Sequence, residues 1–174
     1  MLLQWLAMEN NPRSLDERVN ACIDRTHIRP DWHAYFLRLC EMVASRSHDA
    51  QTQHGAVIVD SHNRIISTGY NGFPSGSPDT EFPNLRPEKY SFMIHAEMNA
   101  IMSAHRSLTD CRIYVTGVPC SRCLIHIAST GMREVRCGSR THADRSSEVE
   151  FVQWFTNKMG MKIHMGQIPQ KQQS

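Results

Sequence analysis

The chain has 174 residues, 40% of them apolar, and 19 basic and 17 acidic residues leave a net charge of +2. This composition excludes a disordered chain, and the length suits one domain with an appendage. The balanced charge gives no electrostatic basis for tight nucleic-acid binding. No apolar run reaches the length of a membrane span, and the first ten residues lack a signal-peptide pattern. We therefore expect a cytoplasmic protein with neither a membrane nor a nucleic-acid partner.

Three parts are predicted along the chain. Residues 1–28 contain only the weakly helical stretches "LLQWLAM" and "SLDERVNACIDR", separated by "NNPRS". We expect this extension to pack loosely or against a neighbouring subunit. A folded domain is predicted over residues 29–167, and the polar stretch 168–174 is predicted to be an unstructured tail.

The first half of the domain predicts a helix and a hairpin. Asp31 can cap a helix that runs to about Ser47, and its apolar face would consist of Trp32, Tyr35, Phe36, Leu39 and Val43. Residues 54–60 and 64–70 are rich in β-branched side chains and flank the turn "SHN", which favours a hairpin. Residues 71–87 are dense in Gly and Pro and predict a long loop.

The second half predicts alternating helices and strands. They are a helix over 96–105, a strand over 111–117, a helix from near Pro119 to Thr130, a strand over 133–139, an amphipathic helix over 147–159 and a strand over 162–166. Gly131 and Gly160 follow the last two helices as natural stops. The order predicts an α/β fold in which helices cover both faces of a sheet.

Two of the six cysteines have an informative spacing. A disulfide framework is the minor interpretation for a chain of this length without an export signal. Cys40 and Cys111 lie in apolar elements and are expected in the core. Cys120 and Cys123 stand three apart where a helix begins, which directs both sulfur atoms to one side.

His95, Cys120 and Cys123 are candidate ligands of one zinc ion. Zinc prefers tetrahedral nitrogen and sulfur donors, and the positive end of a helix dipole favours thiolates. If the two helices leave one edge of the sheet side by side, the ligands converge. Three protein ligands leave a fourth position for water, which is typical of a catalytic site. Spacing alone leaves open a structural site with Cys137 or His126 as the fourth ligand.

Glu97 lies two residues after His95 and is the candidate catalytic group. Bound zinc lowers the pKa of its water to about 7, and a nearby carboxylate can take that proton and pass it to a substrate. The pattern H-x-E followed by P-C-x-x-C is the signature of zinc-dependent nucleobase deaminases.

The stretches "RPDWHAYF", "GAVIVD", "IISTGYNGFPSG", "HAEMNAI" and "VPCSRC" resemble the deoxycytidylate (dCMP) deaminase family, from about Arg29 to Gln167. The zinc motif is shared across cytidine-deaminase-like proteins, whereas "GYNGFPSG" points to the dCMP branch. The resemblance implies a three-layer α/β/α domain with a five-stranded mixed sheet. It also implies hydrolytic deamination of dCMP to dUMP, which supplies thymidylate synthesis.

The resemblance implies roles for particular residues. His95, Cys120 and Cys123 would hold one catalytic zinc ion per chain, with Glu97 as the proton shuttle. Asn71 would hydrogen-bond the sugar, and the Ala96 N–H is a candidate donor to the pyrimidine carbonyl.

Regulation is also implied by the resemblance. Family members are commonly homohexamers that dCTP activates and dTTP inhibits, and Mg²⁺ can accompany such a nucleotide effector. Gly69, Tyr70 and Gly72 would lie in the regulatory region, and Arg106 matches a position linked to effector binding.

The segment "HDAQTQHGAVIV" departs from the family. Many relatives carry arginines before the corresponding strand, and one of them is placed to meet the substrate phosphate. Here Gln51 to His54 occupy those positions, so His54, His48 or Arg46 is a candidate replacement. The insert "SPDTEFPNLRPEKYSFM" lacks the Cys and His residues that hold a second zinc in larger relatives.

Three alternative functions remain at this point. The substrate could be another free cytosine nucleoside or nucleotide. A tRNA or single-stranded nucleic-acid deaminase is disfavoured by the near-neutral charge and the few Trp and Tyr residues. A catalytically silent regulatory module is disfavoured by the intact H-x-E motif and both cysteines.

Overall fold

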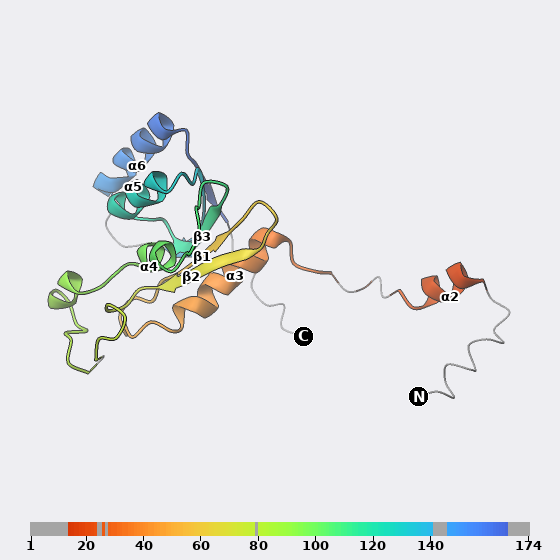
Figure 1. Cartoon of the computed structure of the whole chain (residues 1–174), viewed down its shortest axis with the longest axis horizontal. Coiled ribbons are helices and arrows are strands. Elements are labelled where there is room, and N and C mark those ends of the chain that lie inside the picture. Colours follow the sequence, from red (N-terminus) through yellow and green to blue (C-terminus); the bar gives the residue numbers. More distant parts are fainter. Residues whose placement is uncertain (1–13, 24–25, 27, 79, 141–145, 167–174) are drawn as a thin grey trace.

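The computed structural model describes residues 14–23, 26, 28–78, 80–140 and 146–166, and its centre is a five-stranded mixed sheet (Figure 1). The strand order is β2-β1-β3-β4-β5. Strands β2, β1 and β3 pair antiparallel, and β3, β4 and β5 pair parallel. The strands are β1 (Gly55–Val59), β2 (Ile65–Tyr70), β3 (Arg112–Gly117), β4 (Glu134–Arg140) and β5 (Lys162–Met165).

Helices cover both faces of the sheet, which confirms the predicted three-layer α/β/α fold. Helix α3 (Trp32–Ala44) packs on one face. The other face is covered by α4 (Ala96–Met102), α5 (Ser121–Ser129) and α6 (Ser146–Met159). Every residue of β1 is buried because this strand is central and covered on both sides.

Helix α3 begins after its predicted cap but presents a different face to the sheet. The Asp31 carboxylate accepts hydrogen bonds from the first-turn N–H groups, and the helix ends at Ala44 rather than near Ser47. Two predicted core residues, Trp32 and Tyr35, are 55% and 42% exposed. The buried residues are Ala34, Phe36, Leu37, Cys40 and Ala44.

Close packing against β1 explains this difference. A Cβ atom at Gly55 would lie 2.1 Å from the Cys40 carbonyl oxygen and 2.7 Å from the Ala44 nitrogen. At such a distance only small side chains fit at the point of contact, and Cys40 and Ala44 stand there. This contact fixes the rotation of the helix so that Phe36 and Leu37 are buried and Trp32 and Tyr35 are exposed.

The ends of two strands place two helices side by side. Strands β2 and β3 both pair antiparallel with β1, so they run in the same direction and end at one edge of the sheet. Helix α5 follows β3 directly. The chain returns to the end of β2 through the bridge between Gly72 and Ile94, immediately before α4. Both helix N-termini therefore lie at this edge.

Several predicted boundaries differ from those of the structure. Helix α4 ends at Met102 instead of near His105. Pro119 precedes the N-cap of α5, which is Cys120, and so lies before the first turn. The predicted long loop over 71–87 is followed by a short 3-10 helix, η1 (Glu88–Ser91), which was not predicted.

The N-terminal part contains α2 (Leu15–Ala21), which Ser14 and Glu17 cap and which buries none of its residues. The stretch "LLQWLAM" and the predicted tail lie outside the described residues. The division into residues 1–28, 29–167 and 168–174 therefore stays a prediction. Among the helices that the structure describes, none is long and apolar enough to cross a membrane.

Candidate active site

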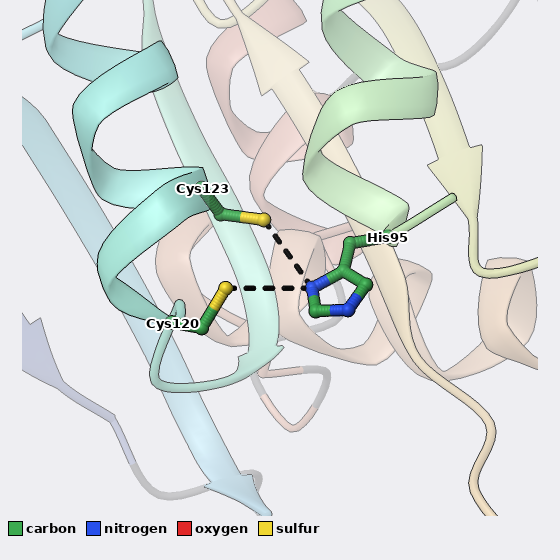
Figure 2. A group of neighbouring side chains, drawn as sticks. All are labelled: His95, Cys120 and Cys123. Carbon is green, nitrogen blue, oxygen red and sulfur yellow. Dashed lines mark hydrogen bonds between the residues drawn. The ribbon is translucent and has the colours of Figure 1, made fainter. Parts of the chain in front are cut away.

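The candidate zinc ligands His95, Cys120 and Cys123 converge at the shared edge of the sheet (Figure 2). His95 is the N-cap of α4, Cys120 is the N-cap of α5, and Cys123 lies in the first turn of α5. Both sulfur atoms point toward the imidazole. The His95 Nδ1 atom is 3.5 Å from the Cys120 Sγ and 3.4 Å from the Cys123 Sγ.

These distances fit a tetrahedral metal site. Zinc–sulfur and zinc–nitrogen bonds of about 2.3 and 2.05 Å, set at the tetrahedral angle, separate the nitrogen and sulfur ligands by about 3.6 Å. The three ligand atoms all lie within 4.8 Å of one another. The donor set of one imidazole and two sulfur atoms is also the set that zinc prefers.

Neither Cys137 nor His126 joins this group. Cys137 is fully buried in the core, where burial raises the pKa of its thiol to about 12. His126 is exposed on α5. Within the described part of the chain, the candidate metal site thus has three protein ligands, and the six cysteines are all free. The arrangement leaves a coordination position for water.

The contact between the two candidate ligand sulfur atoms moves their pKa values in opposite directions. The hydrogen bond with Cys123, helped by His95, lowers the pKa of Cys120 to about 3. The same contact with Cys120 raises the pKa of Cys123. Cys120 is therefore the readily formed thiolate, and a bound metal ion would displace the proton that remains on Cys123.

Glu97 is the second residue of α4 and is only 5% exposed. It lines the same cavity as His95 and Cys120 but is not a member of the ligand group. Burial raises the pKa of its carboxyl group. A carboxyl group in this position can exchange a proton with a water molecule and with a bound substrate.

A cavity of about 120 Å³ opens beside these residues. The end of β3, the start of α4, the loop before β1 and the long loop all contribute to its wall. The lining residues are Asp49, Thr52, His54, Asn71, Arg86, Lys89, Tyr90, Met93, His95, Ala96, Glu97, Val115, Gly117, Val118 and Cys120.

Asn71 and His54 both line the cavity, as their predicted substrate roles require, and they also hold its wall. The His54 N–H donates to Asn71 Oδ1 at 2.6 Å, and Asn71 Nδ2 donates to the Thr52 carbonyl at 2.8 Å. The His54 Nδ1 atom lies 2.9 Å from Thr116 Oγ1. Their contacts with a substrate stay a prediction.

The predicted regulatory residues are not among those that line the cavity. A Cβ at Gly69 would lie 2.2 Å from the Ala100 nitrogen, so this glycine allows α4 to pack on β2. The Tyr70 carbonyl accepts a hydrogen bond from Asn99, and Gly72 pairs with Ile94. Arg106 forms an exposed ion pair of 2.7 Å with Asp110. Their effector role stays a prediction.

Sequence reasoning missed the contribution of the long loop and of η1, which follows it. Arg86, Lys89 and Tyr90 line the cavity, whereas Arg46 and His48, two candidates for phosphate binding, do not. The stretch "LRPEKY" carries two cations and an aromatic residue shortly before the HAE motif. That composition was the signal from which this contribution could have been predicted.

Comparison with known proteins identifies the family. Residues 30–139 match the cytidine and deoxycytidylate deaminase zinc-binding region. An uncharacterized deaminase from the luxG 3′ region of Aliivibrio fischeri is 40% identical, over 78% of this chain and 84% of that protein. Human deoxycytidylate deaminase is 38% identical over 60% of this chain. The match spans 63% of the human protein, less than two thirds of its length.

A solved structure shares the fold. The dCMP deaminase of cyanophage S-TIM5, crystallised with dCMP and dUMP, superposes with a TM-score of 0.62 at 21% identity. The match covers 80% of this chain and all of the phage chain. On its family match and its three converging ligand residues, this chain belongs to the cytidine and deoxycytidylate deaminase family.

Proposed function

We propose that the protein is a zinc-dependent enzyme that hydrolyses dCMP to dUMP and ammonia. The observation that carries this proposal is the convergence of His95, Cys120 and Cys123 beside the buried Glu97 in one cavity. Relatives named deoxycytidylate deaminase from several animals, together with the phage enzyme crystallised with dCMP and dUMP, favour this substrate.

His95, Cys120 and Cys123 would hold one zinc ion through one nitrogen and two sulfur atoms. When bound, this ion supplies a water molecule acidic enough to act as a nucleophile near neutral pH. Glu97 would take one proton from the water and deliver it to N3 of cytosine as the water oxygen bonds to C4. Glu97 would then move the remaining proton of the C4 hydroxyl to the amino group, so that the C4–N bond breaks, a C4 carbonyl forms and ammonia leaves.

The cavity wall would orient the substrate. The Ala96 N–H lies in the first turn of α4, where backbone donors have no partner inside the helix. It is our candidate donor to the pyrimidine carbonyl. Asn71 and His54 line the same cavity, and Asn71 is the proposed partner of the sugar.

The test is a substrate panel. Zinc-loaded protein is incubated with dCMP, CMP, deoxycytidine and dCTP, and loss of the cytosine amino group is followed by chromatography. Preferred conversion of dCMP to dUMP supports the proposal. If the protein preferred another cytosine nucleoside or nucleotide, that compound and not dCMP would be the substrate. Silence on all four with zinc bound would favour a regulatory module of the same fold.

We also propose an assembly and a mode of regulation, both from the family resemblance. We expect a homo-oligomer, with a hexamer favoured, that acts in the cytoplasm to supply dUMP for thymidylate synthesis. Repeating the panel with dCTP or dTTP, each with and without Mg²⁺, tests effector control. Light scattering of the same samples measures the assembly. A monomer indifferent to both nucleotides would contradict this part.

A further inference from the structure

The charges around the cavity are unevenly balanced. Among the residues that line the cavity, the arginine is Arg86 and the lysine is Lys89. Lys89 is 1% exposed, and its Nζ donates to both carboxylate oxygens of Asp49 at 2.7 Å. This geometry neutralises the Lys89 charge and holds it away from any ligand. Lys89 thus belongs to the framework of the wall.

Arg86 is the cation that remains available to a ligand. Its side chain is exposed, and among the described residues no carboxylate forms an ion pair with it. Its Nη2 atom donates to the Thr52 hydroxyl at 2.6 Å, and its guanidinium lies 5.9 Å from the centre of the Tyr90 ring. A guanidinium held in this way presents its other donors at the exposed rim of the cavity.

The segment that carries Arg86 is fixed on both sides. The Lys89 N–H donates to the Leu85 carbonyl at 3.0 Å, and the Tyr90 N–H donates to the Pro87 carbonyl at 3.2 Å. The buried contact of Lys89 with Asp49 ties this turn to the loop before β1. Because the Arg86 side chain is itself exposed, this framework is what gives Arg86 a defined position in the wall that also contains His95 and Glu97.

We propose that Arg86 binds the 5′-phosphate of the nucleotide substrate, with the Thr52 hydroxyl beside it and the Tyr90 ring beneath the guanidinium. A nucleoside monophosphate is doubly charged near neutral pH and needs a cation where it enters a cavity that already contains Glu97. The planar guanidinium matches phosphate oxygens in a two-point contact. Arg86 comes from the long loop and not from the segment Gln51–His54, where the family resemblance would place a phosphate-binding arginine. This inference rests on the proposed function.

The test compares ligands with and without the phosphate. We would measure kcat/KM for dCMP and deoxycytidine, and the Kd of the products dUMP and deoxyuridine, in the unsubstituted protein and in Arg86→Ala. Losing charged hydrogen bonds at this site should lower the dCMP-to-deoxycytidine ratio of kcat/KM by about 10- to 100-fold. The dUMP-to-deoxyuridine affinity ratio should fall by a similar factor. Arg86→Lys should give intermediate ratios, because it keeps the charge but loses the fork.

Arg64→Ala is the matched control, since Arg64 is an exposed arginine outside the cavity lining. It should leave both ratios as they are. Ratios in Arg86→Ala within about twofold of the unsubstituted protein would overturn the inference while leaving the proposed function intact. An equal loss for both substrates would also overturn it, by giving Arg86 a structural role. Failure of the unsubstituted protein to prefer dCMP over deoxycytidine would instead overturn the proposed substrate, and the inference with it.

Discussion

The buried pair of Lys89 and Asp49 is the part of the cavity wall whose loss should cost the most stability. The two residues are 1% and 3% exposed. Their contacts of 2.7 Å join the turn η1 to the loop before β1, 40 positions earlier in the chain. Removing one partner of a buried pair leaves an uncompensated charge, which costs about 3–5 kcal/mol of unfolding free energy.

The two single substitutions should differ within that range. In Lys89→Met, the Asp49 carboxylate keeps the backbone N–H donors of Gln51 and Thr52 at 2.9 and 3.0 Å. We therefore expect a loss of about 3 kcal/mol. Asp49→Asn removes the negative charge and turns one of the two oxygens that face the buried Lys89 ammonium group into an NH₂ donor, so we expect about 5 kcal/mol. The double variant should lose less than the sum, by about 2 kcal/mol or more, because the residues are in contact.

The assay is urea unfolding of the zinc-loaded protein at pH 7, monitored by circular dichroism. All variants are fitted with one common dependence of the unfolding free energy on urea concentration. Arg106→Ala is the control, since it removes an ion pair with Asp110 in which the side chains are 44% and 49% exposed. Its unfolding midpoint should not move. An exposed ion pair contributes up to about 1 kcal/mol. If Lys89→Met lowered the unfolding free energy by less than this, the reasoning would be refuted.

Three further predictions concern the metal, the proton shuttle and acid stability. Glu97→Gln should keep one zinc ion per chain by metal analysis but lower dCMP turnover by at least about 100-fold, and near-full turnover would contradict the mechanism. Cys120→Ser should lose zinc and unfold at lower temperature in a thermal melt; retention of stoichiometric zinc would argue against this ligand. Burial alone would raise the pKa of Asp49, but the hydrogen bond from Lys89 and two backbone N–H groups holds it below the ordinary 3.8. Stability from this group is therefore complete above that pH and lost as pH falls below it. Unfolding free energy should decrease less steeply with acid in Asp49→Asn, and identical slopes would contradict the assignment.

The metal site could be predicted from the sequence because its geometry is local. Cys120 and Cys123 are one turn apart, and His95 begins a helix after the other strand that ends at the same edge. The sequence analysis predicted convergence on the condition that both helices leave one edge of the sheet, and the common direction of β2 and β3 meets that condition.

The remaining wall of the cavity depends on contacts that no periodic pattern encodes. The pair of Asp49 and Lys89 joins a loop to a single turn of 3-10 helix, and the placement of Arg86 follows from it. The prediction of the buried face of α3 was wrong at Trp32 and Tyr35 for a related reason. The rotation of this helix is set by the close contact between its backbone and Gly55 of β1, which the helix sequence alone does not reveal.

The most direct test of the central claim is the fate of dCMP in isotopically labelled water. Zinc-loaded protein is incubated with dCMP in water enriched in oxygen-18, and the product is analysed by mass spectrometry. Our account predicts dUMP that carries one labelled oxygen at C4, together with one equivalent of ammonia. Unchanged dCMP from protein that holds one zinc ion per chain, or dUMP without the label, would contradict hydrolytic deamination by this site.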